Sequence, residues 1–350
     1  MKRIVLLAHD KFSESDEAKT ATGLLRYGHY DVRAVLDRSG AGRRVSDVHP
    51  GGPDVPIVAE MDAVEDEIDA LVVGVASVGG QFDEAWRPDV RAALKRGCTV
   101  VAGLHDFLGE DEEFAALAEA HGGGFWDVRR PPDDLSVGRG VADRVDATVV
   151  LTVGTDCAVG KKTAALELTR AARARGERAA FVPTGQTGVL IAGRGTVVDA
   201  VPADFVAGAV EQMILDLGDD YDWLFVEGQG TIVHPGYSAV SCGLLHGAMP
   251  DALALCHAAG RETLHGYEAF DLPPLREYVQ LHEALARPVH PTRVAAGALN
   301  TSALESDAAA RRAVDRYASA LDRPASDPLR FGVEPLLDAL TDAVPADAQH

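Results

Sequence analysis

The chain has 350 residues, which is room for about two domains of ordinary size and enough to bury a core without disulfide or metal support. Hydrophobic residues make up 47% of the chain and charged residues 25%, a composition that excludes intrinsic disorder. The formal net charge is −21, from 54 acidic and 33 basic side chains, and it disfavours nucleic acid and anionic membranes as partners because both bind clustered Lys and Arg.

Strand and helix patterns alternate through the first half of the chain. We expect β-strands at residues 3–8, 32–36, 70–75 and 99–103, where apolar and β-branched residues run together. Helical patterns separate them at residues 15–27, 89–96 and 112–121. This alternation predicts an α/β fold, with a Rossmann-like parallel sheet as a first domain over residues 1–140. A Pro-rich stretch at residues 131–134 indicates the connection to a second domain.

The same alternation restarts after the connection and predicts a second parallel-sheet domain over residues 146–350. A strand pattern at residues 147–153 leads through a Gly-containing loop to a helical pattern at 161–175. Short apolar strand patterns occur next at residues 179–182 and 223–226. Between these two, apolar residues recur at helical spacing and define one buried face, at Val206, Val210, Met213 and Leu217.

The segment GTDCAVGKKT, residues 154–163, lies between a predicted strand and a predicted helix, which is the context of a phosphate-binding loop. Backbone N–H groups and the helix N-terminus would form an anion cradle, and Lys161 would add a positive charge. The segment departs from the pattern GxxxxGK[ST], because one more residue separates Gly154 from Gly160 and because Lys162 stands at the hydroxyl position. A glycine-rich turn without a ligand is the alternative. Two adjacent lysines in a chain with six lysines argue against that alternative.

Two further loops come after predicted strands at their carboxyl ends, where ligands of open α/β sheets bind. PTGQTG, residues 183–188, contributes Thr184, Gly185 and Gln186, and EGQGTIVHP, residues 227–235, contributes Glu227 and Gly228. We expect the three loops to form one ligand site. Glu227 would bind a cation or orient a nucleophile there, or it would only cap local backbone.

Charge and cysteine usage indicate the environment of the protein. Asp outnumbers Glu by 34 to 20 and Arg outnumbers Lys by 27 to 6, and such an acidic surface is typical of a halophilic organism with abundant salt in its cytoplasm. An acidic protein from ordinary conditions is the alternative. The N-terminal apolar run is too short for a signal peptide, and four cysteines without CxxC spacing suggest no disulfide framework. We therefore expect a cytoplasmic protein.

Taken together, GTDCAVGKKT, PTGQTG and VEGQGTIVHPGYSAVSCGLLHGAMPDALALCH resemble the C-terminal domain of a once uncharacterised family now described as D-glutamate N-acetyltransferases. The N-terminal segments KTATGLLRY, GVASVGG and GLHDFL also resemble that family, so the resemblance reaches about residue 300. It implies transfer of an acetyl group from acetyl-CoA to a D-amino acid, D-glutamate for preference. In that interpretation no metal is needed, and acetyl-CoA is held by Gly154, Thr155, Asp156, Gly160, Lys161, Lys162, Thr163, Thr184, Gly185, Gln186 and Gly228.

The pieces GTD, VGK, PTG and VEG more distantly resemble dethiobiotin synthetase, an ATP- and magnesium-dependent carboxylating enzyme. This resemblance implies a P-loop NTPase-like second domain, with Asp156, Lys161 and Glu227 at nucleotide and metal positions. If Mg-ATP is used, Thr163 and Glu227 would hold the metal, although Lys162 displaces the hydroxyl by one position. An ATP-dependent ligase or kinase, or a non-catalytic nucleotide-binding protein, therefore stand as alternatives.

N-acetyl transfer needs a neutral amine against the thioester carbonyl and donors for the developing oxyanion. His234 and His246, with Glu227 behind them, are the candidate catalytic residues, because imidazole titrates near neutral pH, although a packing role is the alternative for each. The Cys157 thiol is read either as a nucleophile or as a small buried filler. Arg194 and Arg261 are candidate ligands of substrate carboxylates, with a role on the surface as the equal alternative for each. We expect a homo-oligomer that acts on a small amino-acid substrate.

Overall fold

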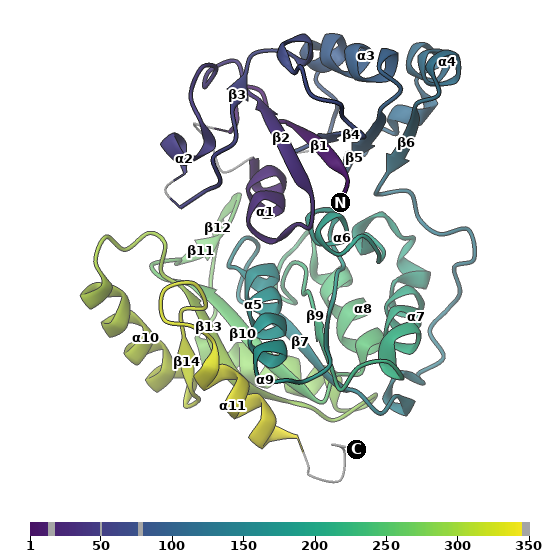
Figure 1. Ribbon diagram of the computed structural model, residues 1–350. Helices are drawn as coiled ribbons and strands as arrows, with labels where there is room; N and C mark the ends of the chain where they lie inside the picture. The colour runs from purple at the N-terminus through teal and green to yellow at the C-terminus, as the bar shows by residue number, and fades with distance from the viewer. Residues whose placement is uncertain (13–17, 50, 76–79, 345–350) are drawn as a thin grey trace. The chain divides into compact units, whose positions relative to one another are not determined.

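The computed structural model describes residues 1–12, 18–49, 51–75 and 80–344, and contacts divide the chain into two compact units (Figure 1). The first unit contains Met1–Pro131 and Val189–Ala200, and the second contains Pro132–Gly188 and Val201–His350. Residues 15–17 of the first predicted helix and 76–79 of the GVASVGG segment lie outside the described residues. Within the described residues no helix is long and apolar enough to cross a membrane.

The first unit is built on a parallel sheet whose described strands run in the order β3-β2-β1-β4-β5-β6. β1 lies in the middle of this order, with β2 and β3 on one side of it and β4, β5 and β6 on the other. This is the Rossmann arrangement, and it confirms the predicted fold of this half. β1 is apolar and almost wholly buried, as expected for a central parallel strand. The elements are β1 (Arg3–Leu7), α1 (Lys19–Tyr27), β2 (Asp31–Leu36), α2 (Val45–Val48), β3 (Ile57–Val58), β4 (Ala70–Val73), α3 (Arg87–Lys95), β5 (Thr99–Ala102), α4 (Glu112–His121) and β6 (Gly124–Asp127).

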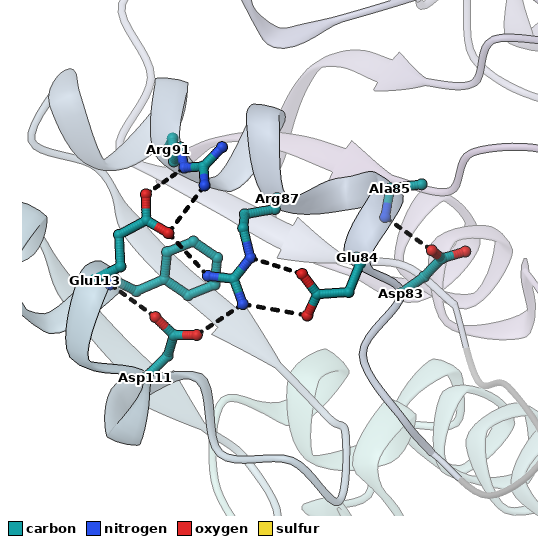
Figure 2. A network of polar contacts seen from close by, with 8 residues as sticks. Asp83, Glu84, Ala85, Arg87, Arg91, Asp111 and Glu113 are labelled. Atoms are coloured by element: carbon teal, nitrogen blue, oxygen red, sulfur yellow. Dashed lines mark hydrogen bonds and ion pairs between the residues drawn. The ribbon is translucent and has the colours of Figure 1, made fainter.

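An ion-pair network joins α3 and α4 on the first unit (Figure 2). The Arg87 guanidinium lies 2.8 Å from Asp111, 2.9 Å from Glu84 and 3.0 Å from Glu113, and it also covers the Phe114 ring at 4.5 Å. Asp111 at the same time caps α4, because its carboxylate accepts the N–H of Phe114 at 3.0 Å. The Arg87 guanidinium lowers the pKa of Asp111. Arg91 of α3 also pairs with Glu113, so two arginines join α3 to α4.

The second unit is a second parallel sheet, with its described strands in the order β14-β13-β10-β7-β9-β8. α5 and α11 pack together against it, and α7, α8 and α9 form another packed group (Figure 1). β11 and β12 form a separate antiparallel hairpin. The elements are β7 (Thr148–Gly154), α5 (Lys161–Ala174), β8 (Ala179–Val182), α7 (Val206–Gly218), β9 (Trp223–Val226), α8 (Ser238–Ala248), β10 (Ala252–Ala258), β11 (Thr263–Leu264), β12 (Tyr267–Asp271), α9 (Leu275–Ala286), β13 (Arg293–Asn300), α10 (Asp307–Leu321), β14 (Ala325–Ser326) and α11 (Glu334–Ala343). α6 (Gln186–Ala192) begins in the second unit and continues into the first.

The segment after the Pro-rich stretch packs on α7. The buried Glu211 carboxylate accepts the backbone N–H groups of Arg139 and Val141 at 2.9–3.1 Å. A Cβ added at Gly208 would lie 1.9 Å from the carbonyl oxygen of Ser136, so only glycine lets the segment approach the helix this closely. The connection is therefore an ordered part of the second unit from at least residue 136.

Candidate active site

The predicted phosphate loop connects β7 to α5, as its strand and helix patterns indicate. β7 ends at Gly154 and α5 begins at Lys161, with Gly160 as the residue before the helix. Ala158 and Gly160 both have a positive φ, 56° and 102°. Left-handed residues of this kind turn successive backbone N–H groups to one side, which is how anion-binding concavities are formed. The loop thus has the backbone of an anion cradle at the start of a long helix.

Lys161 lies inside the loop, with 6% of its surface exposed. Its Nζ donates a hydrogen bond to the carbonyl oxygen of Asp156 at 2.7 Å. A Cβ at Gly154 would come within 2.8 Å of that Nζ, and a Cβ at Gly228 within 3.1 Å of the Lys161 Cδ. Burial lowers the pKa of the ammonium. The two glycines therefore make room for the lysine stem between the phosphate loop and the loop after β9.

Asp156 is fully buried and holds the loop against the β11–β12 hairpin. Its Oδ1 accepts the N–H of Cys157 at 2.6 Å, and its Oδ2 accepts the N–H of His265 at 2.8 Å. The Arg261 guanidinium completes the set at 2.5 Å from Oδ2. Both carboxylate oxygens are thus engaged, and Arg261, a candidate ligand of substrate carboxylates, is paired with Asp156.

Thr155 ties the loop to two neighbouring elements. Its Oγ1 lies 2.8 Å from Nδ1 of His257 at the end of β10, and its carbonyl oxygen accepts the Tyr278 hydroxyl of α9 at 2.8 Å. The His257 ring in turn stacks on Tyr317 of α10. Thr155 therefore positions the loop backbone, and its hydroxyl is already in use.

The Glu227 carboxylate joins the second and third predicted loops. Its Oε2 accepts the backbone N–H groups of Thr184 and Gly185 at 3.1 and 3.2 Å, and its carbonyl oxygen accepts the Thr184 hydroxyl at 2.5 Å. A Cβ at Gly188 would lie 2.2 Å from Oε2. Burial raises the pKa of Glu227, while the positive charge of Lys162 opposes that rise. The structure therefore gives Glu227 the local capping role that the sequence left open.

His234 is the one predicted catalytic histidine that the structure brings to the phosphate loop. The ring is fully buried, its Nδ1 accepts the N–H of Gly236 at 3.0 Å, and its Nε2 has no hydrogen-bond partner among the described residues. Tyr237 stacks on the ring at 4.5 Å between centroids, and Tyr267 contacts it edge-on at 4.7 Å. Burial lowers the pKa of His234. The imidazole is therefore held neutral and in one orientation.

His246 lies apart from these loops. It occupies the last turn of α8, and its Nε2 is 3.0 Å from the carbonyl oxygen of Leu285 in α9. Eight residues separate it from the start of α8, a distance of about 12 Å along a helix axis. The structure thus places His246 in helix packing, at the far end of the helix that comes after the third loop.

The remaining predicted residues have separate positions. Lys162 and Thr163 occupy the half-buried first turn of α5, and Gln186 is the first residue of α6. Arg194 is exposed and belongs to the first unit. Burial raises the pKa of the Cys157 thiol, which is the opposite of what an activated nucleophile needs. The raised pKa favours the interpretation of Cys157 as a small filler over that of a nucleophile.

A cavity of about 10 Å³ is lined by residues of β7, α8, α9 and the third loop. Its lining includes Thr152, Gly154, Thr231, Ser241 and His282. The Thr231 hydroxyl is buried and has no partner among the described residues. A space of this size holds about one water molecule, and Thr231 supplies the polar group that would bind it.

One cluster has the spacing of metal ligands. A ring nitrogen of His234, a carboxylate oxygen of Asp156 and Sγ of Cys157 lie within 4.8 Å of one another. The donors do not fit a metal, because Asp156 already pairs with Arg261 and because Nδ1 of His234 accepts a hydrogen bond, which leaves the ring proton on Nε2. The Glu227 carboxylate, the candidate magnesium ligand, accepts two backbone N–H groups instead.

Sequence reasoning missed several residues that shape the site. Tyr237 and Tyr267 enclose His234, His265 anchors Asp156, and Tyr278 anchors Thr155. Two aromatic residues at 267 and 270 stand close together in a chain with only 6% aromatic residues, and this concentration is the signal by which the hairpin could have been found. The backbone contacts of His265 and Tyr278 leave no comparable pattern.

The arrangement defines a class of protein, with a Rossmann-like unit followed by a unit that carries a phosphate-binding type of loop. The nearby carboxylates of Asp156 and Glu227 accept hydrogen bonds from protein groups. Residues 38–131 match the DUF1611 Rossmann-like domain and residues 136–337 match the DUF1611 P-loop domain, both described as domains of unknown function. The chain belongs to the DUF1611 family.

Three relatives show how far the similarity extends. A D-glutamate N-acetyltransferase of a Pseudoalteromonas species is 36% identical over 76% of this chain and 80% of its own length. A D-glutamate N-acetyltransferase of Tritonibacter scottomollicae is 39% identical over 77% and 80%. The crystal structure of a DUF1611 family protein from Anabaena variabilis superposes with a TM-score of 0.93 at 38% identity, covering 98% of this chain and all of that one.

Proposed function

We propose that the protein is an acetyl-CoA-dependent N-acetyltransferase that acts on a D-amino acid, with D-glutamate as the preferred substrate. The observation that carries the proposal is the 36% and 39% identity to two D-glutamate N-acetyltransferases over about three quarters of the chain. Acyl transfer of this kind joins an amine to the acetyl carbon of a thioester and releases CoA thiol.

The site supports this chemistry. The anion cradle of residues 154–163 would hold a phosphate of CoA, with the N-terminus of α5 and Lys161 supplying positive charge. The second and third loops would complete the binding surface through Thr184, Gly185, Gln186 and Gly228. His234, neutral and buried next to the cradle, would contact the reacting groups.

The second candidate, an ATP- and magnesium-dependent ligase or kinase, finds no favouring observation. A magnesium ion between phosphates needs a free carboxylate and a hydroxyl. Glu227 instead accepts the backbone N–H groups of Thr184 and Gly185 through Oε2.

Thiol release from acetyl-CoA, measured with a panel of D- and L-amino acids in multimolar salt, tests the proposal. We expect release with D-glutamate and much less with L-glutamate. A parallel reaction with Mg-ATP should give no phosphate. Absence of thiol release with every amino acid would overturn the proposal, and amino-acid-dependent phosphate release would favour the ligase.

A further inference from the structure

The ring of His234 carries an N–H, and not a lone pair, at its unpartnered nitrogen. The backbone N–H of Gly236 donates to Nδ1 at 3.0 Å, and a nitrogen that accepts a hydrogen bond carries no proton. In the neutral ring the single proton is therefore on Nε2. Nε2 is buried and has no partner among the described residues.

The surroundings keep this ring neutral. Tyr237 and Tyr267 cover it with aromatic surface, and the side chain is fully buried. The charged and titratable groups that face it from the phosphate loop and α5 are Asp156, Cys157 and Lys161. Burial lowers the pKa of the imidazole more than Asp156 raises it, and Lys161 lowers it further.

A buried donor without an acceptor is costly, so a ligand oxygen that accepts from it is bound more strongly than in water. The strongest acceptors are ionised oxygens. A neutral imidazole with a lowered pKa is suited to donate to an oxygen on which charge develops during a reaction. It is poorly suited to remove a proton through Nε2, because that nitrogen already carries one.

We propose that His234 donates a hydrogen bond from Nε2 to a negatively charged oxygen at the reacting centre, either the thioester oxyanion or the carboxylate of the amino acid, and does not act as the general base. The inference rests on acetyl transfer as the function. In that reaction the neutral amine nitrogen bonds to the acetyl carbon while the C=O electron pair moves to oxygen, and this oxyanion accepts from Nε2. The C–S bond then breaks as the carbonyl re-forms, and the proton lost by nitrogen passes to the CoA thiolate. The other negatively charged oxygen that could accept from Nε2 is the carboxylate oxygen of the amino-acid substrate.

Two substitutions separate the donor from the structural role of the ring. His234→Asn keeps an acceptor for the Gly236 N–H but removes the Nε2 donor, and His234→Gln places an amide N–H near the Nε2 position. We expect His234→Asn to lower kcat by about 100-fold to 1000-fold if the oxyanion accepts, and to raise KM for the amino acid if a carboxylate accepts. His234→Gln should retain most of the activity in either case.

Two kinetic outcomes overturn the inference. If His234→Gln is as inactive as His234→Asn, the ring supplies a base and not a donor. If His234→Asn weakens only the binding of CoA, the acceptor is a CoA phosphate and His234 has no part at the reacting centre. A correctly folded variant is shown by an unchanged circular dichroism spectrum and thermal midpoint.

The tautomer is measured independently of activity by ¹⁵N NMR of the histidine-labelled full chain, with the His234 signals identified by their loss in His234→Asn. We expect a protonated Nε2 and an unprotonated Nδ1 near neutral pH. A protonated Nδ1 would overturn the inference even if the enzyme is active. The expected tautomer in a protein that releases no thiol would instead show that the proposed function is what fails.

Discussion

At the scale of single residues, the Lys161 ammonium donates a hydrogen bond to the carbonyl oxygen of Asp156 in its own loop. Its aliphatic stem lies beside Gly154 and Gly228. We expect Lys161→Met, which keeps the apolar stem, to weaken CoA binding by about 1.5–3 kcal/mol, the range for a hydrogen bond to a charged group. Titration calorimetry with CoA measures this. The exposed Lys95→Met serves as the control and should bind CoA unchanged. Equal affinities for wild type and Lys161→Met would show that the cradle does not hold CoA.

Gly228 has no room for a side chain. A Cβ there would lie 1.7 Å from the backbone oxygen of Thr152, which cannot move without disturbing β7. We expect Gly228→Ala to lower the free energy of unfolding by about 3 kcal/mol or more. Gly124→Ala is the matched control, because nothing lies within 4 Å of a Cβ at that strand position. A urea titration that finds the two variants equally stable would contradict the tight packing of this loop.

Residue types could be predicted from the sequence better than residue roles. The glycines, Lys161 and His234 were predicted to be at the site, and the structure places them on adjoining loops. Asp156 was expected at a nucleotide position, but its partners Arg261 and His265 come from more than 100 residues away. Such long-range contacts leave no local pattern, so sequence reasoning could not tell an engaged carboxylate from a free one.

At the scale of elements, α9 carries a buried acid-sensitive group. The His282 side chain is buried, with 1% of its surface exposed, and its Nδ1 lies 2.7 Å from the carbonyl oxygen of Tyr278. Burial lowers the pKa of His282 to about 4. The unfolded chain binds this proton near pH 6.5, about the ordinary value, so stability is present above that pH and is lost as pH falls toward about 4.

We therefore expect the free energy of unfolding to fall on acidification in this window, by up to about 1.4 kcal/mol per pH unit for this one group. His282→Asn, which keeps a donor for Tyr278, should have a shallower pH dependence by that amount. Denaturant titrations at several pH values measure the difference. Identical slopes for the two proteins would show that folding does not lower the pKa of His282.

Only part of the second sheet could be predicted from the sequence, because β10 and β13, which have seven and eight residues, were not predicted. The predicted strands at residues 147–153, 179–182 and 223–226 match β7, β8 and β9 within one residue. β3 has two residues and β12 is exposed along its whole length, so neither carries the apolar run on which a strand prediction depends. The hairpin that encloses His234 was missed for this reason.

At the scale of the whole molecule, the net charge of −21 opposes folding through self-repulsion. We expect the thermal midpoint to rise as potassium chloride increases from about 0.1 M to about 1 M, where the screening length falls to about 3 Å. A gain of about 1–3 kcal/mol would raise the midpoint by several degrees. Screening also weakens surface ion pairs such as Arg87 with Glu113, but these contribute at most about 1 kcal/mol each.

Differential scanning fluorimetry at increasing salt measures this effect, with sucrose at equal osmolality as the control for general stabilisation. A midpoint that falls as salt increases would contradict the salt-adapted interpretation of the composition.

The overall α/β architecture was predictable because alternating strand and helix patterns extend over both halves. Which segments of the chain belong to which unit was not fully predictable. Val189–Ala200 belongs with the first unit although it lies far along the chain, and Tyr30 and Arg129 hold it there through Leu190 and Asp199. No periodicity marks such an excursion, because it depends on contacts with a distant segment.

The central claim is acetyl transfer to a D-amino acid. Its most direct measurement is mass spectrometry of the products formed from isotope-labelled acetyl-CoA and D-glutamate in multimolar salt, with L-glutamate in a parallel reaction. We expect labelled N-acetyl-D-glutamate and an equal amount of CoA thiol, with far less product from L-glutamate. Unlabelled D-glutamate recovered intact, with acetyl-CoA unchanged, would contradict it.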